Sequence, residues 1–172
     1  MSHPEFSRIV DIRYIEPKPQ IYTATPEECA ALAKRFGLVA IHSLSATLTL
    51  TREAKAVQAN GRLTAAIVQS CAVSAEDLPV SINEPLALRF VPEAALEIKP
   101  DEEVELTEDI LDEIPYTDER FDLGEELAQS LALAIDPFAI GPEAERVRAA
   151  GLLTDELSGP FAALAALKQP KP

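Results

Sequence analysis

The chain has 172 residues, which is the usual size of one compact domain. Hydrophobic residues make up 47% of it, enough for a packed core, but aromatic residues make up 5% and tryptophan is absent, so we expect an aliphatic core. The formal net charge of −14 disfavours broad, non-specific binding to nucleic acids or anionic membranes, because such binding needs a surplus of lysine and arginine.

Nearly all of the negative charge lies in one segment. Residues 93–126 carry fifteen acidic side chains and two basic ones, a net charge of −13, and prolines punctuate them. Dense like charge and proline disfavour helix and sheet, so we expect residues 93–120 to be a mobile acidic connector within a single domain of residues 1–172. The segment is either a solvated loop that aids solubility or a surface that docks on a basic protein or imitates nucleic acid. The rest of the chain is nearly neutral and can still carry a local basic patch.

The N-terminal part predicts a strand and then a helix. Residues 6–15 are rich in β-branched side chains, and two prolines end this strand. Thr25 and Glu28 form a capping box, with proline at the first helical position. The apolar residues that follow recur at helical spacing as far as Gly37, a typical C-terminal stop. We therefore predict a helix over residues 26–36.

Strands dominate the middle of the chain. From residue 44 to residue 51, apolar residues alternate with serine and threonine, which is the pattern of a sheet with one wet face. Asn60 and Gly61 both take positive φ readily, so we predict a type I′ hairpin turn there, followed by a strand over residues 62–71. The alternation then continues in phase over residues 78–90 across Pro85, which indicates either two strands or one bent edge strand.

Helices return after the acidic segment. Asp122 predicts the start of a helix that ends before Pro137, and a short helix is expected over residues 142–150. A further short helix over residues 161–168 needs a surface to pack on. Because the strands lack helical crossovers, a parallel doubly wound sheet is excluded. We predict an α+β fold: an antiparallel β-meander, open or curled toward a half-barrel, packed with N- and C-terminal helices.

The sequence contains no motif for catalysis. Glycine-rich nucleotide loops, a nucleophile elbow and an HExxH motif are all absent, so we predict no enzyme activity, no cofactor and no small-molecule substrate. Cys29 lies on an apolar helix stripe and is most simply a small core residue. A catalytic pairing of Cys71 with His42 has little support, because it rests on one residue of each type. The chain has two histidines, which leaves a conventional zinc site without ligands. With no signal-peptide pattern and no apolar run long enough to span a membrane, we expect a soluble cytoplasmic protein.

Three stretches of the chain together resemble a known family. In order, they are GRLTA at 61–65 with VQSCAVS at 68–74 and INEPL at 82–86, then FDLGEEL at 121–127, then GPFAALAALK at 159–168. With an acidic gap between the first stretch and the second, this order is similar to that of the YceD family, the large ribosomal RNA subunit accumulation proteins of bacteria and plastids. The similarity extends over residues 20–168.

The resemblance implies a non-enzymatic factor that supports the synthesis, processing or stability of large-subunit (23S) ribosomal RNA. Its partner would be that RNA or a pre-ribosomal particle, with a basic ribosomal protein as a second candidate. Many relatives carry a C-x-x-C pair where this chain has Cys71 and Ser74, and some carry a further cysteine where residues 136–146 contain none. The resemblance therefore implies no metal site here, and leaves Cys71 as a remnant or a packed strand-end residue.

Basic side chains near the predicted hairpin are the first candidates for RNA contact. Arg52, Lys55 and Arg62 form a candidate basic patch, and the last two flank the predicted Asn60-Gly61 turn. Loops commonly carry binding residues, although such charges can also be simply solvated.

The tail offers a second set of candidates. Phe161, Leu164 and Leu167 either cap the core of the domain or form a short recognition helix that docks in the groove of a partner, with Lys168 adding charge for an RNA phosphate. The rival function is an acidic protein–protein adaptor that makes no direct RNA contact and binds through the acidic segment and the tail.

Overall fold

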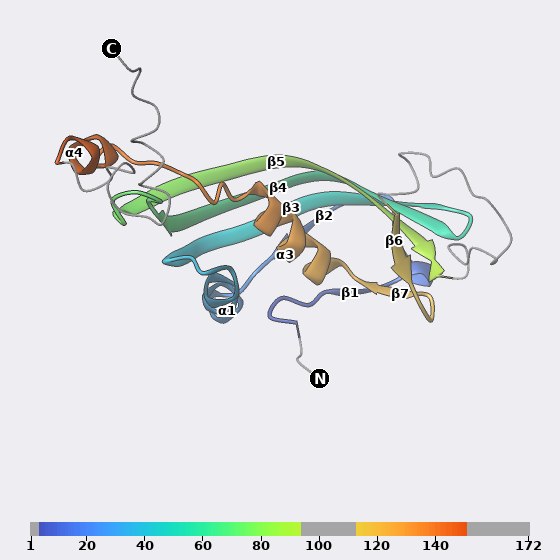
Figure 1. Ribbon diagram of the computed structural model, residues 1–172. Helices are drawn as coiled ribbons and strands as arrows, with labels where there is room; N and C mark the ends of the chain where they lie inside the picture. Colours follow the sequence, from blue (N-terminus) through green and yellow to red (C-terminus); the bar gives the residue numbers. More distant parts are fainter. Residues whose placement is uncertain (1–3, 94–112, 151–172) are drawn as a thin grey trace, which may run out of the picture. The chain divides into compact units, whose positions relative to one another are not determined.

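The computed structural model describes residues 4–93 and 113–150 (Figure 1). These residues belong to two compact units. The larger unit draws on residues 1–69 and 79–136, and the smaller unit draws on residues 70–78 and 137–172.

Two sequence predictions extend beyond the described residues. The predicted tail helix over residues 161–168 lies outside them, and so do residues 94–112 of the predicted connector. The single domain predicted for the whole chain stays a prediction.

Within the described residues, five strands form one open sheet in the order β2-β3-β4-β5-β6. Their bounds are Pro19–Thr23 for β2, Ala40–Glu53 for β3, Ala56–Ser70 for β4, Asp77–Pro92 for β5 and Glu113–Tyr116 for β6. β3 pairs antiparallel with both β2 and β4, whereas β6 pairs parallel with the end of β5. The structure confirms the α+β class and the meander, and the sheet does not close into a barrel.

A short two-stranded ribbon lies beside the sheet. β1 (Ile9–Asp11) pairs antiparallel with β7 (Arg120–Asp122), and β1 runs directly into a single turn of 3₁₀ helix, η1 (Ile12–Tyr14). Phe121 of β7 stacks on Phe90 of β5 with their ring centroids 3.8 Å apart. This aromatic pair joins the ribbon to the sheet.

Both helices of the larger unit pack on the same face of the sheet (Figure 1). Leu32 of α1 (Pro26–Phe36) and Leu127 of α3 (Leu123–Ala134) are fully buried in one core. The strand residues of this core include Leu44, Ala46, Leu48, Leu50, Leu63 and Ala65. The alternate residues of β3 and β4 point to the opposite face, which neither α1 nor α3 covers.

The predicted helix caps are confirmed. The Thr25 side chain accepts the Glu28 N–H, the Glu28 carboxylate accepts the Thr25 N–H, and Gly37 ends α1 with a left-handed φ of 66°. Asp122 caps α3 by accepting two N–H groups of its first turn. In the smaller unit, the helix predicted near residues 142–150 is α4 (Ala144–Ala149).

The predicted hairpin turn at Asn60-Gly61 is wrong. β4 continues through both residues, and the turn between β3 and β4 is the pair Ala54-Lys55. A Cβ on Gly61 would lie 2.0 Å from the carbonyl oxygen of Thr47, so this glycine allows close approach of two strands and makes no turn. In a sequence, a glycine needed for close packing looks the same as one needed for positive φ.

Two predictions for the N-terminal region also need correction. Of residues 6–15, only Ile9–Asp11 forms a strand, because η1 follows at once. β2 is an additional strand that the sequence does not reveal, because a proline such as Pro19 usually ends a strand. Proline is tolerated as the first residue of an edge strand, and Pro19 occupies that position.

The region around the acidic segment differs as well. Of the two alternatives, two strands or one bent edge strand, the structure shows a single strand, β5. It is not an edge strand along its whole length, because β6 pairs with its residues 89–92. β6 lies inside residues 93–120, so regular structure resumes at Glu113, before the predicted end of the connector.

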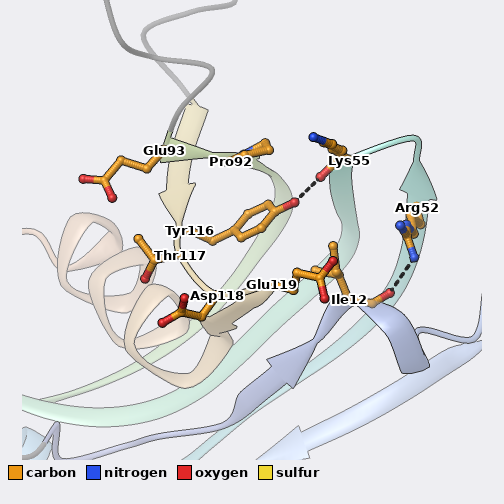
Figure 2. Close-up of a pocket in the computed structure, with 9 residues that line it drawn as sticks. All are labelled: Ile12, Arg52, Lys55, Pro92, Glu93, Tyr116, Thr117, Asp118 and Glu119. Atoms are coloured by element: carbon orange, nitrogen blue, oxygen red, sulfur yellow. Dashed lines mark hydrogen bonds between the residues drawn. The ribbon is translucent and has the colours of Figure 1, made fainter.

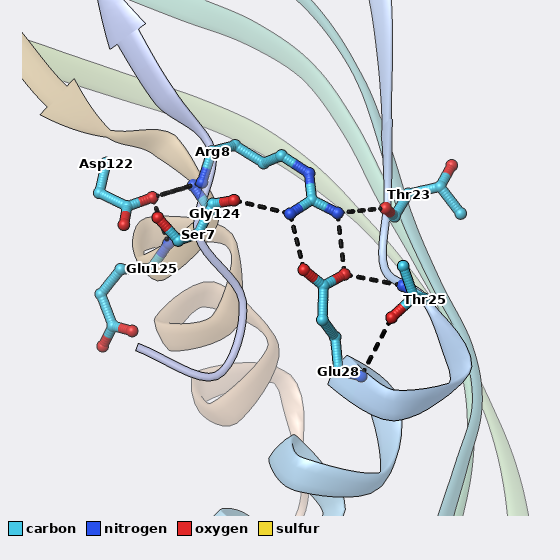
Figure 3. A network of polar contacts seen from close by, with 8 residues as sticks. All are labelled: Ser7, Arg8, Thr23, Thr25, Glu28, Asp122, Gly124 and Glu125. Atoms are coloured by element: carbon cyan, nitrogen blue, oxygen red, sulfur yellow. Dashed lines mark hydrogen bonds and ion pairs between the residues drawn. The ribbon is translucent and has the colours of Figure 1, made fainter. Parts of the chain in front are cut away.

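The Arg8 side chain joins the N-terminal stretch, β2 and α1 (Figure 3). Its guanidinium forms a bidentate pair with the Glu28 carboxylate at 2.7 and 2.8 Å. It also donates to the carbonyls of Ser7 at 2.6 Å and Thr23 at 2.8 Å. The same carboxylate accepts the Thr25 N–H at 2.7 Å, so the ion pair and the helix cap share one group.

The backbone of Arg8 extends this junction to α3. The Arg8 N–H donates to the Asp122 carboxylate at 2.7 Å, beside the Gly124 N–H at 3.0 Å (Figure 3). A Cβ on Gly124 would lie 2.7 Å from the Arg8 nitrogen and from the Phe6 oxygen, so only glycine lets α3 begin this close to the N-terminal stretch. The junction therefore orients both helices.

Replacing Glu28 should destabilise the larger unit in a pH-dependent way. Glu28→Gln removes a charge-assisted bidentate pair, so we expect a loss of about 1–2 kcal/mol at pH 7. The hydrogen bond from Arg8 holds the pKa of Glu28 below its usual value, so its contribution is present above about pH 4.3 and is lost as pH falls through the lowered pKa. Denaturant unfolding at pH 7 and pH 3 should show the difference between variant and wild type shrinking on acidification. Glu27→Gln, in the same helix turn, is the control, and an equal loss for both variants would contradict the account.

Substitution at Gly61 separates close packing from a turn. Gly61→Ala should cost about 1–3 kcal/mol, because the added methyl group meets the Thr47 carbonyl. Asn60→Ala, one residue away on an exposed position, should change stability by less than about 0.5 kcal/mol. Thermal unfolding of both variants checks this, and a large loss at Asn60 would favour the turn instead.

Candidate functional site

A hollow of about 480 Å³ lies where the β3–β4 turn, η1, the end of β5 and the turn between β6 and β7 meet (Figure 2). Its lining residues are Ile12, Arg52, Lys55, Pro92, Glu93, Tyr116, Thr117, Asp118 and Glu119. The structure thus brings together two of the three basic residues that the sequence nominated, Arg52 and Lys55. A hollow of this volume is in the range of nucleotide and other small-ligand sites.

Backbone carbonyls hold the Arg52 guanidinium. Its Nε donates to the carbonyl of Ala54 at 2.9 Å, and its Nη1 donates to the carbonyl of Ile12 at 3.5 Å. Ala54 is the first residue of the two-residue turn and has a positive φ of 55°. Because a carbonyl carries no net charge, the guanidinium keeps its full positive charge and further N–H donors for an anion.

Lys55 is fixed through its backbone. Its carbonyl accepts a hydrogen bond from the Tyr116 hydroxyl at 2.5 Å. Burial raises the pKa of Tyr116, so this phenol stays protonated at neutral pH and can donate. The Lys55 ammonium group has no ion-pair partner among the described residues.

Unpaired cations are the exception in this acidic protein. Of the lysine and arginine side chains that the structure describes, four have no described carboxylate within ion-pair distance: Lys34, Arg52, Lys55 and Arg62. The four include every basic residue that the sequence nominated near the hairpin. A cation that is in no ion pair can bind a phosphate without first breaking a salt bridge.

Arg62 does not join the other two. It lies opposite Thr47 in the ladder, and its Nη1 donates to the Asn83 side chain at 2.8 Å on the face of the sheet away from the helices. Arg52 lies opposite the buried Val57, and therefore on the helix-bearing face. The single basic patch expected from the sequence is therefore split between two faces of the sheet.

A strained turn supplies two carboxylates to the hollow. The Arg120 N–H donates to the Thr117 carbonyl at 3.0 Å, and the residues between them, Asp118 and Glu119, have φ of 52° and 56°. Positive φ at both central positions is the type I′ pattern, which favours Asn-Gly or Asp-Gly. A non-glycine residue in this conformation costs about 1 kcal/mol. The Ile12 N–H donates to the Glu119 carbonyl at 3.0 Å and ties the turn to η1.

The carboxylates of the hollow differ in how they are paired. Glu119 lies 3.5 Å from the Arg13 guanidinium, whereas Asp118 and Glu93 have no ion-pair partner among the described residues. Sequence reasoning missed all three because it assigned them to a connector without regular structure. The one local signal was Asp118, since aspartate tolerates the left-handed conformation that a tight turn requires.

In the smaller unit, backbone N–H groups surround the sulfur of Cys71. Its Sγ accepts hydrogen bonds from Val73 at 3.4 Å, Ser74 at 3.3 Å and Gly141 at 3.3 Å. These donors, Gly141 first, lower the pKa of the Cys71 thiol to about 7. Cys71 is buried just after the end of β4, in agreement with a packed strand-end residue.

The residues around Cys71 do not fit a metal site. The Ser74 hydroxyl, at the position of the second cysteine in many relatives, bonds the Glu76 carboxylate at 3.1 Å, and that carboxylate also accepts the Glu143 N–H at 2.9 Å. Within residues 4–93 and 113–150, no group of three or more His, Cys, Asp or Glu side chains could hold a metal ion. No helix among the described residues is long and apolar enough to cross a membrane.

Relieving the strained turn should stabilise the protein. Glu119→Gly places the preferred residue at the second central position of a type I′ turn, so we expect a gain of up to about 1 kcal/mol in the free energy of unfolding. Thr117→Gly, in the same turn at negative φ, should instead lose about 0.5–1 kcal/mol. Denaturant unfolding compares the two, and a loss at both positions would mean that the Glu119 side chain stabilises the turn by more than its strain costs.

One family model matches this chain, over residues 59–168, and its description is "Large ribosomal RNA subunit accumulation protein YceD". No curated protein and no solved structure gives a significant match. The match includes Arg62 and the strained turn and begins after Arg52 and Lys55. Because it covers more than half of the chain, the chain belongs to the YceD family.

Proposed function

We propose that this protein binds large-subunit ribosomal RNA, or a pre-ribosomal particle that contains it, and supports the synthesis, processing or stability of that RNA without catalysing a reaction. The family is described by the accumulation of this RNA. The observation on this chain that carries the proposal is the pair of unpaired cations, Arg52 and Lys55, beside the 480 Å³ hollow. We expect it to act in the cytoplasm.

Carboxylates of the protein compete with RNA phosphates for its cations. In a chain of net charge −14, a paired arginine must release its carboxylate before it can bind a phosphate. Arg52 and Lys55 need no such exchange, and backbone hydrogen bonds already hold the turn that carries them. Binding through two such cations is weak by itself and falls steeply with salt. This fits a factor that joins a particle transiently.

The face of the sheet away from the helices offers a second contact surface. Its positions in the middle of β3 and β4 carry hydroxyl and amide side chains, Arg62 and no carboxylate: Ser45, Thr47, Thr49, Thr51, Gln58, Asn60, Arg62 and Thr64. Such groups can bond phosphate and ribose oxygens, and Arg62 supplies the charge. This surface would give the RNA a second contact, on the face of the sheet opposite to the one that carries Arg52.

The acidic segment is suited to binding a second partner. Residues 93–126, with a net charge of −13, suit a basic ribosomal protein, whereas the adaptor alternative gives this segment and the tail all of the binding. Ribonuclease treatment separates the two. Association with pre-ribosomal particles that is lost on treatment supports direct RNA contact, and association that persists supports the adaptor.

Neutralising Lys55 tests the proposal with an internal control. Lys55→Ala should weaken binding to transcribed large-subunit ribosomal RNA and lower the slope of log affinity against log salt by about 1. Lys34→Ala removes an equally unpaired charge from α1 and should leave both quantities unchanged. Filter binding between low and physiological salt measures them. Equal losses for the two variants, or no salt-dependent binding by the wild type, would contradict the proposal.

A further inference from the structure

We propose that the hollow between the two tight turns takes a single unstacked guanine nucleotide, with its phosphate toward Arg52 and Lys55 and its base toward Asp118. This inference rests on the proposed function and deepens it, because it names the part of the RNA that the site reads. Proteins that recognise RNA by sequence commonly bind splayed-out bases of single strands in pockets. The hollow, at about 480 Å³, has room for one nucleotide.

The two cations of the hollow lie apart from its two unpaired carboxylates. In Figure 2, Arg52 and Lys55 lie on one side of the Tyr116 ring, together with the carboxylate of Glu119, which lies 3.5 Å from the Arg13 guanidinium. The carboxylates of Glu93 and Asp118 lie on the other side of the ring. A ligand that complements both sides must carry an anionic group at one end and hydrogen-bond donors at the other. A nucleotide has this division between its phosphate and the edge of its base.

The choice of base depends on the hydrogen bonds that a carboxylate can form. A carboxylate only accepts hydrogen bonds when it is ionised, and it has two acceptor oxygens. Guanine is the one common base whose Watson–Crick edge presents adjacent donors, N1–H and the N2 amino group, that can bond both oxygens. Uracil presents one N–H between two carbonyl oxygens, and a carboxylate repels those oxygens. Asp118 therefore favours guanine and disfavours uracil.

Asp118, and not its neighbour Glu119, is the carboxylate that would recognise the base. Its carboxylate has no ion-pair partner among the described residues, whereas its neighbour Glu119 lies 3.5 Å from Arg13. Both residues have positive φ, in a turn that Ile12 holds by a backbone hydrogen bond to Glu119. Non-glycine residues in strained turns are frequent where a side chain is needed for binding. The turn presents one free carboxylate and one that is already engaged.

The test is a titration of the full chain, followed by two-dimensional ¹H–¹⁵N NMR, with guanosine, inosine and uridine 5′-monophosphates. The amides of residues 54–55 and 117–119 should shift and saturate, and guanosine monophosphate should bind about tenfold more tightly than uridine monophosphate. Inosine monophosphate, which lacks the N2 amino group, should fall between them. Equal affinities, or shifts confined to other residues, would overturn the inference.

Two variants of the turn sharpen the test. Asp118→Asn keeps a residue that tolerates positive φ but replaces one acceptor by a donor, so it should abolish the preference for guanine without weakening the binding of uridine monophosphate. Glu119→Gln makes the same change on the carboxylate that Arg13 engages, and should keep the preference. A preference that survives in Asp118→Asn would overturn the role of this residue.

The outcomes also separate this inference from the proposed function. Salt-dependent binding of ribosomal RNA without any preference between the monophosphates overturns the guanine site and leaves the proposed function standing. A guanine preference without RNA binding overturns the assignment to RNA, and makes free guanine nucleotides the ligand. Three results together support the inference: a preference for guanine, the loss of that preference in Asp118→Asn, and RNA binding that is weaker in Lys55→Ala.

Discussion

The bidentate pair between Arg8 and Glu28 determines how the N-terminal stretch meets the two helices of the larger unit. It joins the N-terminal stretch to the end of β2 and to the first turn of α1, and the Arg8 backbone continues the junction to the cap of α3. The chain then passes through β1 into η1, whose Ile12 lines the hollow. A charge pair about 20 residues apart in sequence thereby helps to place a site at the opposite end of β1.

The site depends on backbone conformations that non-glycine residues rarely adopt. Ala54, Asp118 and Glu119 all have positive φ, and none of them is glycine. The two turns that contain them bring Lys55 and Asp118, neither of which has an ion-pair partner among the described residues, to one hollow, while elsewhere in the described residues such charges mostly pair with each other. Strain and unpaired charge in one place are what a binding site requires and what stability alone would remove.

Local sequence signals predicted the fold well where the structure of a segment depends on residues within that segment. The Thr25 capping box and the Gly37 stop fix both ends of α1, and the alternation from residue 44 to residue 51 gives β3 its inner and outer faces. Gly61 was wrongly predicted to form a turn because its role depends on Thr47 in another strand. The site was predictable only in part. The sequence proposed Arg52 and Lys55 as contact residues, but it placed the hairpin turn at Asn60-Gly61 and not at Ala54-Lys55. The separation of these residues from Arg62 depends on the strand register, and the role of Asp118 depends on a turn without glycine.

The central claim is that the protein touches large-subunit ribosomal RNA through the end of the sheet that carries Arg52 and Lys55. Ultraviolet crosslinking in growing cells, with sequencing of the bound RNA and mass spectrometry of the crosslinked peptides, tests it most directly. The account predicts enrichment of a defined region of large-subunit RNA, and crosslinks in peptides that contain residues 52–55 or 116–119. A background RNA profile, or crosslinks confined to other peptides, would contradict it.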